Sequence, residues 1–273
     1  MPDLRETLLK LKTDKVLFAE SALRLSDDPL RLEPHQKKPL MSSSKNKFLD
    51  WGRRMGKTTV EAVDILHTMV FEPGSYCLYI APSQEQASEF SYMLKDIATH
   101  SPATTPLVSG MTAYSVKFTL QGKPYSRFKA RTASREGKSI RGKGVTHLYV
   151  DEVRDVPKQA LSAILPAVRG QRLQSKIFFS STREGDDPEI DLVTLLMQTQ
   201  GIEVFHQKTC EAEILKDGTA KISRIHTDRI SKEDLQLDLK IMGPSRWLCE
   251  YCCVPMSEAG NLYPPDLVNA AVT

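Results

Sequence analysis

Residues 51–58 combine glycines, arginines, a lysine and a threonine in the order that a phosphate-binding loop needs. Gly52 and Gly56 lack the Cβ that would keep a phosphate away from the backbone. Lys57 can reach the β- and γ-phosphates, and Thr58 can offer its hydroxyl to Mg²⁺. The rest of the expected nucleotide-binding set is Arg53, Arg54 and Thr59. This pattern predicts binding and hydrolysis of a nucleoside triphosphate.

The sequence around the loop has the strand–loop–helix order that phosphate loops require. Lys47-Phe48-Leu49 can end a buried strand, and apolar residues recur at helical spacing after Thr58. One position departs from the usual G-x-x-x-x-G-K-S/T pattern, because Trp51 stands where the first glycine is expected. The alternative interpretation is a basic helix start on a solvated face.

A second motif, His147 to Glu152, is an apolar strand that ends in two acids. Phosphoryl transfer needs one carboxylate to hold Mg²⁺ and another to polarise the attacking water. We therefore expect Asp151 to join Thr58 as a magnesium ligand and Glu152 to act as the general base. The alternative is a strand end with solvated acids, which is common in isolation.

A third strand, Lys176 to Phe179, leads into Ser180-Ser181-Thr182-Arg183. Hydroxyl side chains at the carboxyl end of a strand can sense the γ-phosphate and couple its loss to movement. We assign this coupling role to Ser181 and Thr182. The competing interpretation is that these residues simply form a turn.

These motifs, together with Pro34-His35-Gln36 and Ser139-Ile140-Arg141-Gly142, resemble the ATPase domain of a tailed-phage terminase large subunit. That family pumps viral DNA into an empty capsid. The resemblance implies that Gln36 reads the adenine edge and that Arg53 faces the γ-phosphate. It also implies that Arg141 is an arginine finger supplied to the ATP of a neighbouring subunit. Each of the three residues can also be an ordinary polar surface or loop residue.

The resemblance further implies a set of partners and a location. The substrate is ATP with Mg²⁺, and the cargo is double-stranded DNA. The subunits form a homo-oligomeric ring that works with a portal protein and a small terminase subunit. The protein is expected in the cytoplasm of the infected bacterial host, transiently docked on the procapsid.

Length and composition set outer limits on these interpretations. The chain has 273 residues, of which 40% are hydrophobic and 26% charged, as in an ordinary globular protein. No apolar run approaches the ~18 residues of a membrane span, and residues 1–6 carry no secretory pattern. We therefore expect no membrane contact.

The five cysteines allow a metal-site alternative. His206-x-x-x-Cys210 and Cys249-x-x-Cys252-Cys253 have ligand spacing for zinc. The two pairs lie far apart, however, and the second falls in a probable helix. Buried free thiols are the favoured interpretation.

The stretch from Lys123 to Lys143 has eight cationic residues and one acid, a net charge of +7. Because the whole chain has a net charge of +3, the remaining residues sum to −4. Arg127, Lys129 and Arg131 alternate with smaller or apolar residues, which places all three cations on one face of a strand. Such a stripe can follow DNA phosphates without reading bases. A solvated strand face is the equally weighted alternative.

The pattern of apolar segments predicts an α/β fold, and the phosphate loop and the family resemblance imply that it is of the P-loop NTPase (ASCE/RecA-like) class. A mainly parallel central sheet flanked by helices, with helices at residues 1–30 outside it, should occupy residues 1–210. Residues 116–120 and 125–130 predict a hairpin. Residues 211–273 should form a small lid subdomain and the start of a linker to a nuclease domain that this chain lacks.

Nuclease activity is not expected, because the acids Asp186, Asp187, Glu189 and Asp191 are more simply explained as a helix N-terminus. Two other functions compete with the packaging motor. A DExx-type helicase or other DNA translocase shares the motifs but would need a second RecA-like domain. A nucleotide-binding scaffold without turnover is disfavoured because Glu152 is present.

Overall fold

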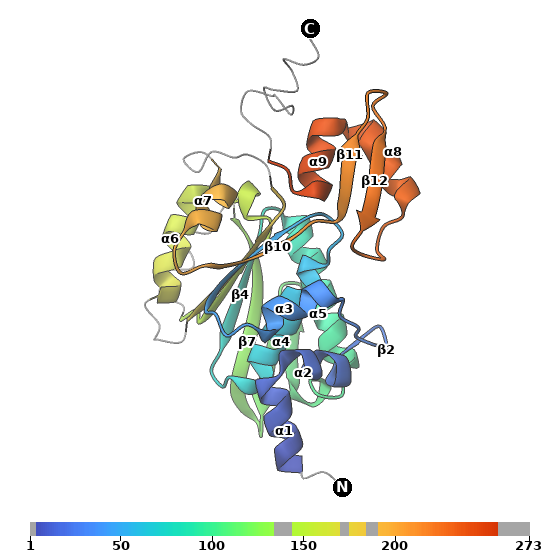
Figure 1. The fold of residues 1–273 in the computed structure, drawn as a ribbon. Helices are drawn as coiled ribbons and strands as arrows, with labels where there is room; N and C mark the ends of the chain where they lie inside the picture. Colours follow the sequence, from blue (N-terminus) through green and yellow to red (C-terminus); the bar gives the residue numbers. More distant parts are fainter. Residues whose placement is uncertain (1–3, 134–143, 170–174, 184–190, 256–273) are drawn as a thin grey trace. The chain divides into compact units, whose positions relative to one another are not determined.

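The computed structural model describes residues 4–133, 144–169, 175–183 and 191–255 (Figure 1). The helices are α1 (Leu4–Thr13), α2 (Lys15–Ala22), α3 (Pro34–Met41), α4 (Lys57–Phe71), α5 (Gln84–His100), α6 (Lys158–Arg169), α7 (Leu192–Gln198), α8 (Lys232–Met242) and α9 (Pro244–Cys252). The strands are β1 (Arg24–Leu25), β2 (Asp28–Pro29), β3 (Asn46–Trp51), β4 (Tyr76–Ala81), β5 (Val108–Thr112), β6 (Ser115–Leu120), β7 (Lys123–Thr132), β8 (His147–Val150), β9 (Lys176–Ser181), β10 (Glu203–Gln207), β11 (Cys210–Ile214) and β12 (Ala220–Ile225).

The main sheet has eight strands in the order β10-β3-β9-β8-β4-β7-β6-β5. Strand β4 pairs in parallel with both β7 and β8, and β8 pairs in parallel with β9. Strands β5, β6 and β7 are successively antiparallel, so the sheet is mixed at that edge. Helices α4, α5 and α6 occur between strands of the sheet, as parallel pairing requires. The expected α/β phosphate-loop fold with a mainly parallel sheet is confirmed.

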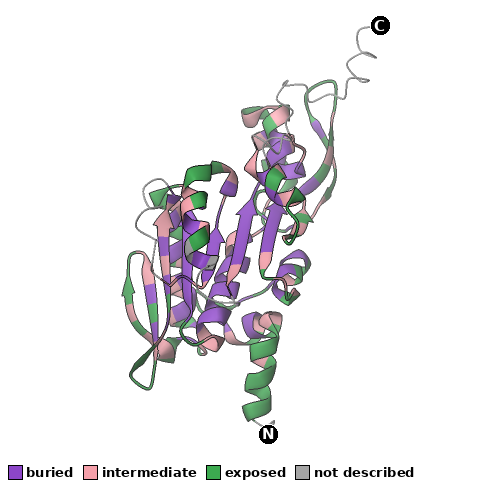
Figure 2. Cartoon of the chain, turned by 90° about the vertical axis from the view of Figure 1, so that its left-hand side faces the viewer, coloured by how far each residue is buried: buried purple, intermediate pink, exposed green. Residues whose placement is uncertain are grey.

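The strands of the parallel region are continuous apolar runs in the sequence because both of their faces are buried. Every residue of β4 and of β8 is buried, as expected for strands covered on both faces. Helix α4 buries most of its residues, whereas α1 has no buried residue (Figure 2). Among the described residues, no helix combines the length and the apolar character needed to cross a bilayer.

The predicted hairpin between β6 and β7 is confirmed by their antiparallel pairing. Gln121 and Gly122 connect the strands with φ values of 53° and 75°. Two successive positive φ values give the right-handed twist that a two-residue hairpin needs. Glycine adopts this conformation without strain, and Gln121 bears the cost of a side chain there.

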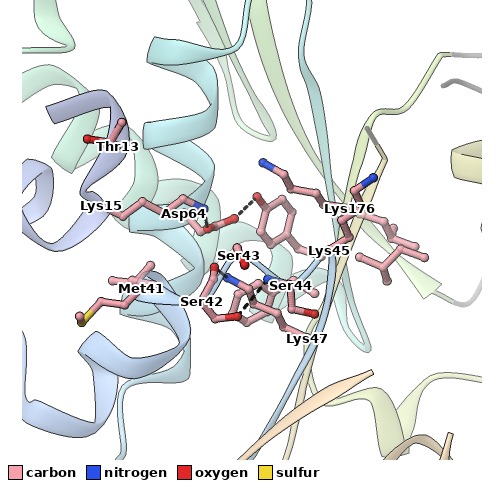
Figure 3. Close-up of a pocket in the computed structure, with 15 residues that line it drawn as sticks. Thr13, Lys15, Met41, Ser42, Ser43, Ser44, Lys45, Lys47, Asp64 and Lys176 are labelled. Carbon is pink, nitrogen blue, oxygen red and sulfur yellow. Dashed lines mark hydrogen bonds and ion pairs between the residues drawn. The ribbon is translucent and has the colours of Figure 1, made fainter. Parts of the chain in front are cut away.

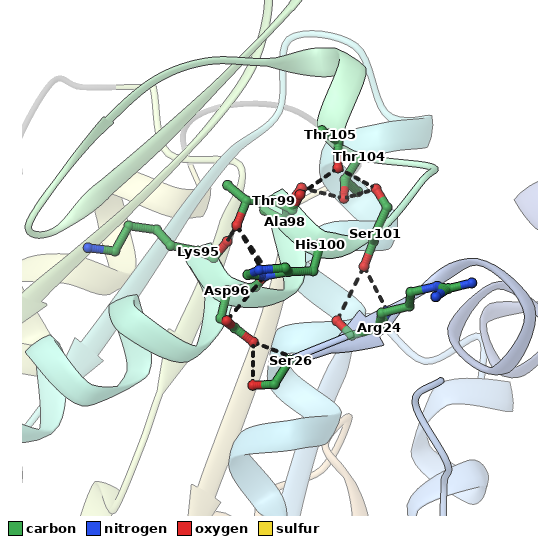
Figure 4. Close-up of polar contacts among 10 residues, drawn as sticks. All are labelled: Arg24, Ser26, Lys95, Asp96, Ala98, Thr99, His100, Ser101, Thr104 and Thr105. Atoms are coloured by element: carbon green, nitrogen blue, oxygen red, sulfur yellow. Dashed lines mark hydrogen bonds and ion pairs between the residues drawn. The ribbon is translucent and has the colours of Figure 1, made fainter. Parts of the chain in front are cut away.

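Hydroxyl side chains cluster at the C-terminal end of helix α5 (Figure 4). Thr104 Oγ1 donates to Ala98 O at 2.8 Å, and Thr105 Oγ1 donates to Thr99 O at 2.8 Å. Ser101 Oγ accepts from Arg24 N at 2.8 Å, which ties the β1 segment to this helix end. The two threonine bonds satisfy carbonyls that the C-terminus of the helix would otherwise leave unpaired.

His67 of α4 is a buried histidine held among aromatic rings. Its ring contacts Phe18 of α2 edge-on at 5.3 Å and Phe71 at 4.8 Å. Nε2 lies 3.1 Å from Leu11 O and therefore carries the proton, while the buried Nδ1 has no hydrogen-bond partner. Burial, followed by repulsion from Lys15, lowers the pKa of His67 from 6.5 to about 4.

We expect this histidine to make stability fall as the pH is lowered from 6.5 to about 4. In this window the unfolded chain takes up a proton that the folded chain does not, so protons favour unfolding. The difference in pKa corresponds to roughly 3 kcal/mol. Chemical denaturation at the two ends of this pH range measures the change in the free energy of unfolding. His67→Phe should remove most of this pH dependence, and an undiminished dependence in that variant would contradict the assignment.

Residue contacts divide the chain into two compact units. One unit contains the described parts of residues 1–47 and 56–179, and the other those of 48–55 and 180–273. Within the second unit, β11 and β12 pair antiparallel and share a core with α8 and α9. This core contains Cys210, Ala220, Leu235, Leu239, Trp247, Tyr251 and Cys252. The C-terminal segment thus has its own apolar core, although residues 48–55 and 180–209 cluster with it.

Candidate nucleotide-binding site

The second half of the phosphate loop begins helix α4. Gly56 is the residue before the helix and has φ 73° and ψ 37°, a left-handed conformation that glycine adopts most easily. Its carbonyl accepts from Thr59 N at 3.1 Å, so the first turn forms directly on the loop. Lys57 and Thr58 are therefore the first two residues of a helix whose N-terminus favours anions.

The lysine of the loop and the expected general base form an ion pair. Lys57 Nζ lies 3.1 Å from Glu152 Oε1, and the two side chains are 8% and 19% exposed. Glu152 has φ 41°, a left-handed conformation that is strained for a residue with a side chain. The strained turn after β8 thus directs this carboxylate to the phosphate loop. The two motifs, about a hundred residues apart in sequence, meet at one point.

Asp151 is fixed by two hydrogen bonds at the end of β8. Its Oδ2 accepts from Tyr79 Oη at 2.7 Å, and its Oδ1 accepts from Glu152 N at 3.0 Å. Burial, together with the neighbouring Asp151 charge, raises the pKa of Tyr79 well above its ordinary value, so the phenol stays a donor. A carboxylate with further lone pairs is a suitable oxygen ligand for Mg²⁺.

Gln36 lies beside the loop from helix α3. Its side-chain nitrogen is 3.4 Å from Gly56 O, and its Oε1 accepts from Glu33 N at 2.9 Å as part of a capping box. The residue is fully buried. Its proximity to the loop agrees with a place near the nucleotide, and its capping bond gives it a structural role as well. Reading of adenine stays a prediction.

The first half of the loop packs against Gln207, Thr209 and Tyr251. Gly52 N donates to Gln207 O at 3.0 Å, so this N–H is engaged by β10. A Cβ at Gly52 would lie 2.3 Å from Thr209 Oγ1 and 3.0 Å from Tyr251 O. The glycine is therefore required here by close backbone packing, a reason that the motif does not contain. Trp51, the departure from the motif, is buried at the end of β3.

Arg53 is bound to Glu250 of helix α9, a residue that the sequence analysis did not single out. Arg53 Nε and Nη2 lie 2.7 and 3.3 Å from the two carboxylate oxygens of Glu250. The Glu250 side chain is 2% exposed, whereas that of Arg53 is 48% exposed. Arg53 N also donates to Glu250 O at 2.8 Å. The loop arginine thus has a carboxylate partner inside its own unit.

Asp50, one residue before Trp51, lies close to the side chains of Arg183, His206 and Cys253, which the sequence analysis did not connect with it. Arg183 Nη2 lies 3.0 Å and His206 Nδ1 2.6 Å from its Oδ2. Asp50, His206 and Cys253 have ligand atoms within 4.8 Å of one another, a different set from the zinc ligands considered above. Arg183 already neutralises this carboxylate, which disfavours a second cation there.

The five cysteines are free and buried, as favoured from the sequence. Cys210 and Cys252 have their sulfurs 3.7 Å apart within the core of the C-terminal segment. Ser181 and Thr182, the expected coupling residues, are almost completely buried at and after the end of β9. Asp191 accepts from Val193 N and Thr194 N at the start of α7, which confirms its role as a helix cap.

The cations of β7 alternate with buried residues as predicted. Phe128 and Ala130 are buried, while Arg127, Lys129 and Arg131 are exposed or half-buried. The Arg127 guanidinium lies 4.0 Å from the centre of the Tyr76 ring. Their contact with DNA stays a prediction. Arg141, Asp186, Asp187 and Glu189 lie outside the described residues.

No protein-family model and no curated protein matches the chain. Several solved structures match the chain. The large-terminase ATPase domain of Thermus phage P74-26 matches with a TM-score of 0.64 at 17% identity, over 81% of this chain and 93% of that one. The HK97 bacteriophage large terminase matches with a TM-score of 0.69 at 19% identity, over 88% of this chain and 54% of that one.

A third match is the large terminase of a thermophilic bacteriophage solved in complex with ADP. Its TM-score is 0.58 at 15% identity, and the alignment covers 82% of this chain and 53% of that one. At these identities the likeness establishes the fold. The chain has the fold of phage large-terminase ATPase domains, as the motifs led us to expect.

Proposed function

We propose that the chain is an ATPase motor of viral DNA packaging, which couples ATP hydrolysis to translocation of double-stranded DNA into a procapsid. The observation that carries this proposal is the contact between Lys57 and Glu152 on a terminase-type fold. A phosphate-binding cation and a carboxylate base at one point are what phosphoryl transfer to water requires. The ADP bound to one structural neighbour supports the same substrate.

Each residue has a defined task in this proposal. Lys57 neutralises charge on the β- and γ-phosphates, and Glu152 leaves Lys57 to accept a proton from the water that attacks the γ-phosphorus. Breaking the bond from that phosphorus to the bridging oxygen releases ADP and phosphate. Gln36 would orient the base. Ser181 and Thr182 would transmit the loss of the γ-phosphate to the C-terminal segment.

A magnesium ion fits the donor set of this site. Mg²⁺ prefers oxygen ligands and usually combines one or two protein groups with substrate phosphates. The hydroxyl of Thr58 and the carboxylate of Asp151 are the protein groups that would hold it. The ion would supply charge neutralisation on the β- and γ-phosphates.

The partners of the motor follow from the same proposal. The stripe of Arg127, Lys129 and Arg131 would follow the DNA backbone. Arg141 would complete the active site of a neighbouring subunit, so turnover needs an oligomeric ring. A portal protein and a small terminase subunit would complete the packaging machine. The described C-terminal residues 210–255 form a hairpin with two helices.

The proposal is tested by measuring Mg²⁺-dependent ATP hydrolysis with and without linear duplex DNA. We expect hydrolysis that DNA stimulates and that rising salt suppresses, because salt weakens phosphate contacts. Strand separation of a forked duplex, with no dependence on duplex DNA, would instead favour a helicase.

The Arg53–Glu250 ion pair makes a further prediction about nucleotide affinity. If Arg53 turns to the γ-phosphate, it must first leave Glu250, and the lost ion pair opposes ATP binding. Because Arg53 is half exposed, this cost is about 1 kcal/mol, so Glu250→Gln should bind ATP about fivefold more tightly. Fluorescent-nucleotide titration measures the change. Glu213→Gln, an exposed acid on β11, is the matched control, and unchanged or weaker binding in Glu250→Gln would contradict the exchange.

A further inference from the structure

A cavity of about 210 Å³ lies at the amino ends of three strands of the main sheet. Its wall includes residues from the segment before β3, from β8 and from the start of β9. Strand β3 leads at its other end into the phosphate loop, so this cavity is separate from the nucleotide site. The charged side chains that line the cavity are those of Lys15, Lys45, Lys47, Lys176 and Asp64 (Figure 3).

The charges around this cavity are strongly unbalanced. Four lysines face one carboxylate, which gives the lining a formal charge of +3. Lys15 is paired with Asp64. Lys176 Nζ contacts Glu72, an acid outside the lining, at 2.5 Å. Even with Glu72 included, two positive charges remain in excess.

The floor of the cavity is a fixed, buried charge network. Asp64 accepts from Tyr149 Oη at 2.7 Å. Burial by itself would raise the pKa of Asp64, but Lys15 and Lys47 lower it well below its ordinary value, so the carboxylate is ionised. Lys47 is buried and donates to Pro39 O and Ser42 O at 2.5 and 2.9 Å. The lysines of the floor are therefore held in place before any ligand arrives.

Serine hydroxyls line the rim of the cavity, where Ser44 Oγ already donates to Asn46 O at 2.9 Å. Ser42, Ser43 and Ser44 form the short connection between α3 and β3, and all three line the cavity. Ser44 N donates to Ser42 Oγ at 3.0 Å, and Ile177 N donates to Lys45 O at 2.9 Å. These bonds tie the serine connection to itself and to β9. Lys45 is exposed at the rim.

We propose that this cavity binds a phosphate group. Lysine ammonium groups are compact point charges with three donors, and serine hydroxyls add neutral donors, a combination that suits a tetrahedral oxyanion. The single carboxylate of the lining is already compensated, so it does not repel an anion strongly. The volume corresponds to about seven waters at ~30 Å³ each, which accommodates phosphate or pyrophosphate. The proposal does not depend on ATP hydrolysis.

Calorimetric titration of the full chain with inorganic phosphate and with pyrophosphate tests this proposal. Lys57→Ala serves as the background, because it weakens phosphate binding at the loop. Lys45→Ala is the test variant, since its side chain is exposed and its removal should leave the fold intact. Lys38→Ala, an exposed lysine of α3 that does not line the cavity, is the matched control.

We expect binding that persists in Lys57→Ala, weakens about tenfold on Lys45→Ala and is unchanged by Lys38→Ala. Amide chemical shifts of Ser42 to Lys45 should move on titration. Binding lost in Lys57→Ala, or insensitive to Lys45, would overturn the proposal. A short 5′-phosphorylated oligonucleotide, compared with its dephosphorylated form and with free phosphate, identifies the source. Preference for the 5′-phosphorylated form indicates a DNA end, and equal affinity with free phosphate indicates a small anion.

Discussion

Replacing Arg141 with alanine is expected to lower ATP turnover by about 10³–10⁵-fold, the effect of removing an arginine finger in other nucleotide hydrolases. The guanidinium would stabilise charge on the transferring phosphoryl group of a neighbouring subunit, so ATP binding by the variant should change little. Single-turnover kinetics separates the two quantities. Lys138→Ala, in the same basic stretch of the sequence, is the control for a general loss of positive charge.

The action of Arg141 across a subunit boundary can be tested by mixing variants. Arg141→Ala keeps its own base, and Glu152→Gln keeps its own finger, so a mixed oligomer contains some complete sites. We expect a mixture of the two inactive variants to recover part of the parent activity. A mixture that stays inactive, while the parent is fully active, would show that both residues act within one subunit.

Replacing Glu152 with glutamine is expected to lower turnover by about 10²–10⁴-fold, the usual contribution of a general base. The amide retains the size of the side chain but cannot accept a proton from water. It also removes the negative charge 3.1 Å from Lys57 Nζ, so ATP should bind at least as tightly as it does to the parent. Steady-state rates and nucleotide titration measure the two effects.

Asp155→Asn is the matched control for this variant. Asp155 is a neighbouring acid whose side chain is half exposed and contacts Arg154 rather than Lys57. Its replacement should leave turnover within a few-fold of the parent. If Asp155→Asn were as damaging as Glu152→Gln, or if Glu152→Gln retained full turnover, Glu152 would not be the base.

Most of the local structure could be predicted because its signals are local. The helical spacing after Thr58, the apolar runs of β4 and β8, and the turn at Gln121 and Gly122 each lie within a few residues of the element that they specify. The meeting of Lys57 with Glu152 could also be expected, because both motifs follow strands of one parallel sheet. Phosphate chemistry then required the two motifs to be adjacent.

The sheet order and the partners of the loop could not be predicted in the same way. The position of β10 beside β3 and the ion pair of Asp50 with Arg183 both join segments that are more than 130 residues apart in the sequence. Glu250 lies in an ordinary amphipathic helix, and nothing in its neighbours indicates that it binds Arg53. The glycine at position 52 was explained from phosphate chemistry, whereas the structure shows close packing against Thr209 and Tyr251. Such contacts become visible once the chain is folded.

The most direct test of the proposed motor is the rate of Mg²⁺-dependent ATP hydrolysis as a function of protein concentration, with Glu152→Gln as the blank. The proposal predicts a rate per subunit that climbs with concentration as subunits come together and that is lost in the blank. A rate no higher than that of Glu152→Gln at any concentration would contradict ATP hydrolysis at this site. A genuine rate per subunit that is independent of concentration would contradict the shared active site of a ring.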